Sequence, residues 1–174
     1  MAQHPDDEIR FRREQGDLEA LFRAHHAEII RFLTARLGSR DEAADLAGEV
    51  FVDAVNRVPR LRWRGRPVLA WLYRVAANKA ADHVKRAARE TPVADPPAEP
   101  AGSNDTLGDR DALARAMRTL PPDQALAVHL RLVEDRSFVE VGRLMGRSPA
   151  ACQMLVLRAG RHLQEALRRE GVRA

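Results

Sequence analysis

A proline-rich stretch near the middle of the chain constrains the fold most strongly, because it fits neither a helix nor a sheet. Residues 91–108 read TPVADPPAEPAGSNDTLG, with four prolines, several small residues and acids without a single base. Such a segment buries too little apolar surface to fold, so we predict a flexible, extended linker. The linker divides the 174-residue chain into an N-terminal extension over 1–16 and two domains over 17–90 and 109–170.

Both domains carry apolar residues at helical spacing. In the first domain we expect helices over about 17–37 and 39–58, separated by Gly38, and a third helix over about 68–89. Ser39 begins the second of these helices, with a glutamate three residues later that completes a capping box. No segment alternates between apolar and polar residues over six positions, so no sheet is expected. The predicted fold is all-α, with an N-terminal helical bundle and a C-terminal helix-turn-helix domain.

The second domain has the spacing of a helix-turn-helix. Two helices are expected over about 109–119 and 123–133. Ser137 then starts a short helix with another capping box, and Gly146 is placed to end it in the left-handed conformation. A second capping serine followed by proline starts the last helix, which runs to about residue 170. A helix projected after such a turn fits a major groove, although the same spacing also occurs in ordinary helical bundles.

Basic residues are concentrated between positions 57 and 89. This segment holds ten arginines and lysines against one acid, Asp82, and it also contains Trp63, Trp71 and Tyr73. Cations neutralise phosphates and flat rings stack on exposed bases, so this mixture favours nucleic-acid binding. For the charge run alone, a solvated basic helix face is an equally good interpretation.

The sequence also excludes several classes of protein. No uncharged apolar run approaches the ~20 residues of a spanning helix, so we expect no membrane insertion. The first residues lack the apolar segment of a secretory signal, which predicts a cytoplasmic location. The single cysteine, Cys152, excludes an internal disulfide and a CxxC site. No histidine lies at ligand spacing from acids or the cysteine, and no nucleophile–base pair is indicated, so we expect no metal, no cofactor and no enzymatic activity.

Four blocks of the sequence resemble a known family. The first domain contains DLEALFRAHHAEIIRFLTARLG, DEAADLAGEVFVDAV and AWLYRVAANKAADHVKR, and the second contains LPPDQALAVHLRLVEDRSFVEVGRLMGRSPAACQMLVLRAGRHL. In this order, around an acidic proline-rich linker, they are similar to bacterial extracytoplasmic-function (group IV) RNA polymerase sigma factors. The resemblance covers roughly residues 17–167. It implies a subunit that joins core RNA polymerase, recognises promoter DNA, and is commonly held silent by an anti-sigma factor.

The resemblance also implies which residues carry these functions. The family's contact with core polymerase matches Asp45, Glu49 and Phe51, although Phe51 suits the intramolecular core equally well. The contact with the minus-ten element falls on the loop and helix of the basic segment: Arg60, Arg62, Trp63, Arg64, Arg66, Tyr73, Arg74, Asn78, Lys79 and Lys85. Contacts with the minus-thirty-five element fall on the helix-turn-helix: Gln153, Met154, Leu157 and Arg158 toward base edges, and Arg131 and Arg147 toward phosphates.

Two features leave alternatives open. The family often has a basic run where this chain has Gln153, Met154 and Leu155, and another arginine where it has Gly160, so the base specificity of this helix is undetermined. A stand-alone helix-turn-helix regulator, with the first domain used for dimerisation or sensing, is the alternative function. The aromatic, basic segment favours the sigma factor, because a dimerisation domain does not need it.

Overall fold

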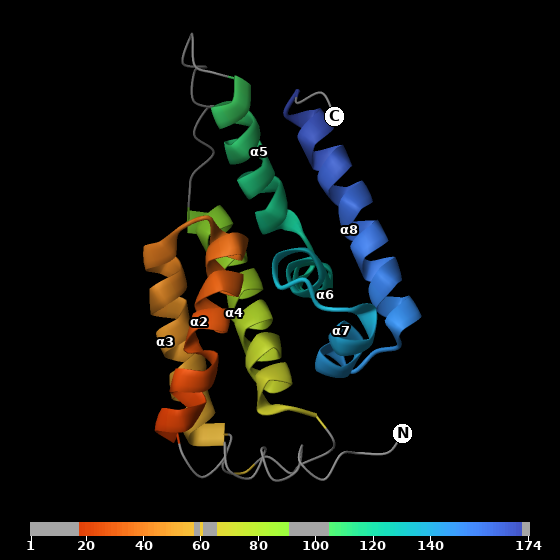
Figure 1. Cartoon of the computed structure of the whole chain (residues 1–174). Helices are drawn as coiled ribbons and strands as arrows, with labels where there is room; N and C mark the ends of the chain where they lie inside the picture. The colour runs from red at the N-terminus through yellow and green to blue at the C-terminus, as the bar shows by residue number, and fades with distance from the viewer. Residues whose placement is uncertain (1–17, 58–59, 61–65, 91–104, 172–174) are drawn as a thin grey trace.

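The computed structural model describes residues 18–57, 60, 66–90 and 105–171, and every regular element in these ranges is helical. The expected N-terminal extension and residues 91–104 of the expected linker lie outside the described residues. In these ranges the elements follow one another in this order, with the α-helices labelled in Figure 1: α2 (Leu18–Leu37), α3 (Arg40–Arg57), α4 (Val68–Glu90), α5 (Asp105–Thr119), α6 (Pro122–Val128), the π-helical turn η2 (His129–Val133), α7 (Phe138–Met145) and α8 (Pro149–Arg169). The predicted all-α fold is therefore confirmed.

Helices α2, α3 and α4 form the first domain. Gly38 adopts φ +76°, which ends α2 in the left-handed region that glycine tolerates best. The hydroxyl of Ser39 then accepts a hydrogen bond from the Glu42 backbone N–H at 3.3 Å, as expected for the start of α3. Buried side chains at helical spacing, such as Ile29 of α2 and Val50 of α3, build the core between the three helices.

Helices α5 to α8 form the second domain. The capping box at Ser137 is present, with its hydroxyl bound to the Glu140 backbone N–H and the Glu140 carboxylate bound to the Ser137 backbone N–H. Gly146 ends α7 at φ +66°, and Ser148 caps α8. Helix α5 begins at residue 105, inside the segment that we expected to be linker. The last proline of that segment is residue 100, so no proline interrupts a helix from 105 onward.

The two domains pack against each other instead of standing apart. Helix α4 lies between the α2–α3 pair and the α6–α7 pair, and α5 packs against α2 (Figure 1). One hydrophobic cluster therefore runs through both domains, from Leu72 and Tyr73 of α4 to Leu130 of η2 and Leu144 of α7. None of the described helices is both long enough and apolar enough to cross a bilayer.

Candidate polymerase and nucleic-acid interfaces

The outer face of α3 is acidic and open to solvent. Asp45 and Glu49 are exposed, and their spacing of four residues puts them on one side of the helix. The Glu49 carboxylate accepts a hydrogen bond from Lys79 Nζ of α4 at 3.0 Å, and Asp53 lies 3.5 Å from the same ammonium group. Val52 adds an exposed apolar group, with 60% of its surface accessible. This surface, which we call the α3 surface, combines carboxylates with apolar contact area.

Phe51, which the resemblance matched to the polymerase contact and which suited the core equally well, lies in the core of this arrangement. Only 7% of Phe51 is exposed, and its ring packs edge-on against Phe22 at 4.9 Å between centroids. Burying the ring removes its apolar surface from water, and the core position is therefore favoured. Phe22 of α2 is 43% exposed instead.

Tyr73 is likewise a core residue and not a residue open to DNA bases. Its exposure is 0%, and its ring packs edge-on against Phe32 at 5.7 Å. The hydroxyl has no hydrogen-bond partner among the described residues, and burial raises the pKa of the phenol above its ordinary value. The neighbouring Trp71 is half-buried against the same core. Neither ring stands free for stacking in this conformation.

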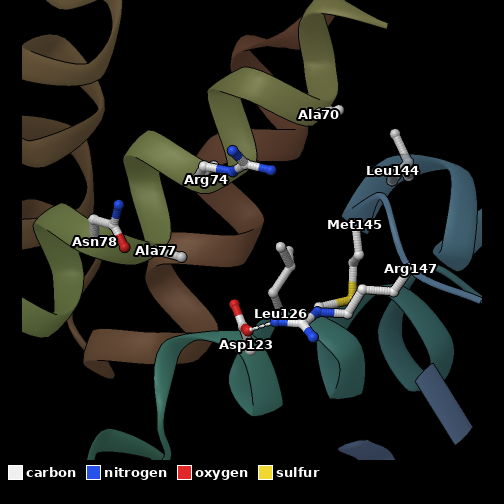
Figure 2. A pocket seen from close by; sticks show the side chains of 9 residues that line it. All are labelled: Ala70, Arg74, Ala77, Asn78, Asp123, Leu126, Leu144, Met145 and Arg147. Carbon is white, nitrogen blue, oxygen red and sulfur yellow. Dashed lines mark hydrogen bonds and ion pairs between the residues drawn. The ribbon is translucent and has the colours of Figure 1, made fainter. Parts of the chain in front are cut away.

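Two of the remaining candidates on α4 face the second domain. Arg74 and Asn78 are exposed, and both line a cavity of about 210 Å³ between α4, α6 and α7 (Figure 2). The opposite wall of the cavity includes Leu144 and Met145 of α7. The guanidinium of Arg66, just before α4, lies so close to Gly146 that a side chain at Gly146 would collide with it.

The other basic residues of this segment differ in their surroundings. Lys79 is held by the carboxylates of α3, whereas Lys85 and Arg60 are exposed. The predicted contacts Arg62, Trp63 and Arg64 lie outside the described residues. We call the set Arg66, Arg74, Asn78, Lys79 and Lys85 the α4 surface. It offers cations and one amide that presents both a donor and an acceptor.

The first half of α8 presents an open face. Gln153, Met154, Leu157 and Arg158 are all exposed, while Cys152 and Ala159 bury the opposite side at 0% exposure. Burial raises the pKa of the Cys152 thiol, so this side chain serves as a small buried core residue.

Both predicted phosphate-contacting arginines already have partners within the chain. Arg131 bonds to Asp135 at 2.9 Å and lies over the Phe138 ring at 5.5 Å from its centroid. Arg147, at the turn before α8, pairs with Asp123 of α6. A phosphate contact at either position therefore requires the arginine to leave its carboxylate partner first.

A polar cluster that sequence reasoning missed joins the two domains. Arg31 of α2 forms a two-pronged ion pair with Glu134, at 2.9 and 3.1 Å, and Arg136 pairs with Glu28 of α2 at 3.1 Å. Each pair joins residues more than 100 positions apart, so no local pattern in the sequence indicates it. Arg36, only 3% exposed, donates to the backbone carbonyls of Met117 and Leu120 near the end of α5.

Burial strongly affects the ionisation of two members of this interface. His129 of η2 is 1% exposed and lies against the Phe32 and Tyr73 rings. Loss of solvation lowers its pKa to about 4, although Glu134 lies 3.4 Å from its Nε2 atom. Burial also lowers the pKa of Arg36 to about 10. In the described part of the chain, no group of three histidine, cysteine or acidic side chains is arranged to hold a metal ion.

Comparison with protein families matches both domains. The sigma-70 region 2 model matches residues 21–90, and the sigma-70 region 4 model matches residues 110–163. The first match contains α3 and α4 with their exposed faces, and the second contains the exposed half of α8.

Individual proteins match across both domains. The ECF RNA polymerase sigma factor BldN of Streptomyces coelicolor is 30% identical over 173 residues, which cover 92% of this chain and 65% of BldN. The ECF RNA polymerase sigma factor SigD of Mycobacterium tuberculosis is 30% identical over 154 residues, covering 80% of this chain and 71% of SigD. The sigma factor RpoE, solved in complex with the anti-sigma factor NepR from Bartonella quintana, shares the fold, with a TM-score of 0.56 and 23% identity over 87% of this chain and 97% of RpoE.

Proposed function

The chain belongs to the extracytoplasmic-function RNA polymerase sigma factors, non-enzymatic initiation factors that direct RNA polymerase to promoters, and we propose that it performs this function through three surfaces. The α3 surface binds core polymerase, the α4 surface binds the minus-ten element, and the exposed face of α8 reads the minus-thirty-five element. The protein acts in the cytoplasm, where polymerase and promoter DNA meet.

The observation that carries this proposal is the open face of α8. Gln153 and Arg158 are exposed there beside two apolar side chains, and nothing in the described chain covers them. Arginine binds guanine through two hydrogen bonds and glutamine binds adenine in the same way, while apolar groups contact the thymine methyl. The N-terminal half of this helix therefore has the chemistry for reading base edges in a major groove.

The test is transcription in vitro with core polymerase on a library of promoters. Arg158→Ala lowers initiation from the preferred promoters by about 5- to 150-fold, which corresponds to ~1–3 kcal/mol for one two-bonded base contact. Arg161→Ala is the matched control, because Arg161 is exposed on the same helix one turn later. Unchanged initiation and unchanged minus-thirty-five preference in Arg158→Ala would remove the assignment.

The α3 surface is tested by removing its charge without changing its shape. Asp45→Asn combined with Glu49→Gln weakens binding to core polymerase by about tenfold or more, because interfacial carboxylates lose their cationic partners. Glu165→Gln, on exposed α8, is the control. Equal retention of all three proteins on immobilised polymerase would contradict the assignment.

A gel shift separates this function from that of a stand-alone regulator. A sigma factor of this kind shifts promoter duplex only when core polymerase is added, whereas tight duplex binding by the free chain would favour a repressor or activator. We further propose that an anti-sigma factor silences this chain, as the relative RpoE was solved with NepR. Recovery of a protein that blocks polymerase binding would support this regulation.

A further inference from the structure

The cavity between α4, α6 and α7 contains polar groups that the rest of the described chain leaves unpaired (Figure 2). Arg74 and Asn78 line it from α4, and neither side chain forms a hydrogen bond or an ion pair with another described residue. Both are exposed, so a ligand reaches them from solvent. The other arginine of the lining, Arg147, is already paired with Asp123. Among the described residues, the lining therefore offers one spare positive charge and one amide that can both donate and accept.

The opposite wall of the cavity is apolar and buried. It is formed by Leu126 of α6 and by Leu144 and Met145 of α7, which are 6%, 8% and 8% exposed. The small side chains of Ala70 and Ala77 line the same space from α4. A purely inorganic anion would face this wall without hydrogen bonds, whereas a ligand with an apolar part would bury that part away from water.

The volume of the cavity limits the apolar part to about one ring. The cavity measures about 210 Å³. This is the volume of roughly seven water molecules, and a cavity of roughly 150 Å³ holds one benzene ring. Drug-sized ligands occupy pockets of roughly 300–1,000 Å³ and are too large. A single spare guanidinium matches a single carboxylate, which arginine binds through two parallel hydrogen bonds.

We propose that this cavity binds a small organic acid. The carboxylate of the acid pairs with Arg74 and accepts a hydrogen bond from the amide of Asn78, and its apolar part packs against the wall of α6 and α7. The same two residues of α4 belong to the minus-ten contact of the proposed function, on which one consequence rests. The bound acid and the minus-ten strand exclude each other, so the acid lowers initiation when the protein is limiting.

NMR titration of the full chain with benzoate tests the site. Benzoate combines a carboxylate with one ring, benzamide keeps the shape without the charge, and acetate keeps the charge without the ring. We expect benzoate to shift the amide signals of α4 and α7 around the cavity in a saturable way, with a dissociation constant of about 1 mM. Benzamide and acetate should bind about tenfold more weakly or less, because each lacks one of the two interactions.

Two variants remove the polar side of the site. Arg74→Gln should weaken benzoate binding by about tenfold, since a hydrogen-bonded charge is lost. Asn78→Asp places a second carboxylate beside that of the ligand and should weaken binding by a similar factor. Arg86→Gln is the matched control, because Arg86 is exposed on the same helix and does not line the cavity. All three side chains are exposed, and circular dichroism verifies that helicity is kept.

Three results of the titration would overturn the site: no saturable shift with benzoate, equal shifts with acetate, or an unchanged benzoate affinity in Arg74→Gln. The titration uses neither polymerase nor DNA, so its failure leaves the proposed function standing. A chain that binds benzoate but never initiates transcription with polymerase contradicts the proposed function alone.

Transcription with core polymerase tests the exclusion of the minus-ten strand. At limiting protein, about 10 mM benzoate in place of the same concentration of acetate should lower initiation about tenfold, the occupancy expected for a dissociation constant of about 1 mM. A large excess of the chain should restore initiation, which separates occupancy of this protein from inhibition of polymerase. Unchanged initiation, or inhibition that excess protein does not relieve, would overturn the exclusion.

Discussion

Replacing Tyr73 tests whether this ring belongs to the protein core or to a DNA contact. The ring is fully buried between Phe32 and His129, and its hydroxyl lacks a hydrogen-bond partner among the described residues. An unsatisfied buried hydroxyl costs about 1–3 kcal/mol, so Tyr73→Phe removes this cost while keeping the ring. We expect Tyr73→Phe to raise the free energy of unfolding by about 1 kcal/mol, and Tm by about 2–4 °C for a chain of this size. Tyr73→Ala removes the ring and costs about 3–5 kcal/mol, as for other buried aromatic residues.

Urea and thermal unfolding followed by circular dichroism measure these changes. Tyr73→Leu tests whether the ring contributes to DNA binding, because this variant keeps apolar volume in the core and removes the flat ring. On the folded variant, affinity for a minus-ten oligonucleotide stays unchanged if the ring never stacks on a base. A lost stacking contact instead costs about 1–3 kcal/mol per base, and such a loss in Tyr73→Leu would refute the core assignment. Destabilisation by Tyr73→Phe would show that the hydroxyl is bonded.

Three further predictions concern stability. The pKa of His129 is about 4 when buried and about 6.5 in an unfolded chain, so the packed state binds fewer protons and loses roughly 3 kcal/mol as pH falls from 6.5 to 4. The ion pair with Arg31 also lowers the pKa of Glu134, which adds to the loss of stability in acid. His129→Leu should flatten the pH dependence of the free energy of unfolding in urea between pH 4 and 6.5. Ser137→Ala removes the cap of α7 and should cost about 1 kcal/mol in the same assay, whereas Ser137→Asp should retain most of the stability. Gly142→Ala places a Cβ 2.7 Å from the Arg147 backbone oxygen and should cost about 1–3 kcal/mol, so an unchanged Tm would show that this turn relaxes freely.

Local signals predicted the helices and their ends well. The signals at Ser39, Ser137 and Gly146 act over one helical turn. The two serines cap the starts of α3 and α7, and Gly146 ends α7 in the left-handed conformation, as these residue types favour. The beginning of α5 was less predictable, because the helix enters a segment whose composition resembles a linker. Composition describes only the average of a stretch of sequence. Helix α5 packs on α2 and α8, and this tertiary packing stabilises helical turns that the composition alone does not predict.

Contacts between the domains were beyond prediction from local sequence. The resemblance assigned Tyr73 to the minus-ten contact, but α4 is packed on two sides and buries nine residues, Tyr73 among them. The small residues Ala70, Ala77 and Ala81, all buried on α4, were a signal for this close approach. The four α8 residues that the resemblance assigned to base edges are all exposed, since burial in this half of the helix follows a single face. The roles of those side chains on DNA remain predictions.

The position of Lys79 has a consequence for how DNA binding responds to ionic strength. Its ammonium group is already neutralised by two carboxylates of α3, at 3.0 and 3.5 Å. When Lys79 exchanges a carboxylate for a DNA phosphate, it still displaces a counterion from the DNA. The carboxylate that it leaves behind is then unpaired and attracts a cation from solution, which offsets part of that release. The logarithm of affinity should therefore fall less steeply with the logarithm of salt concentration than the number of basic residues implies. Neutralising those carboxylates should steepen the slope.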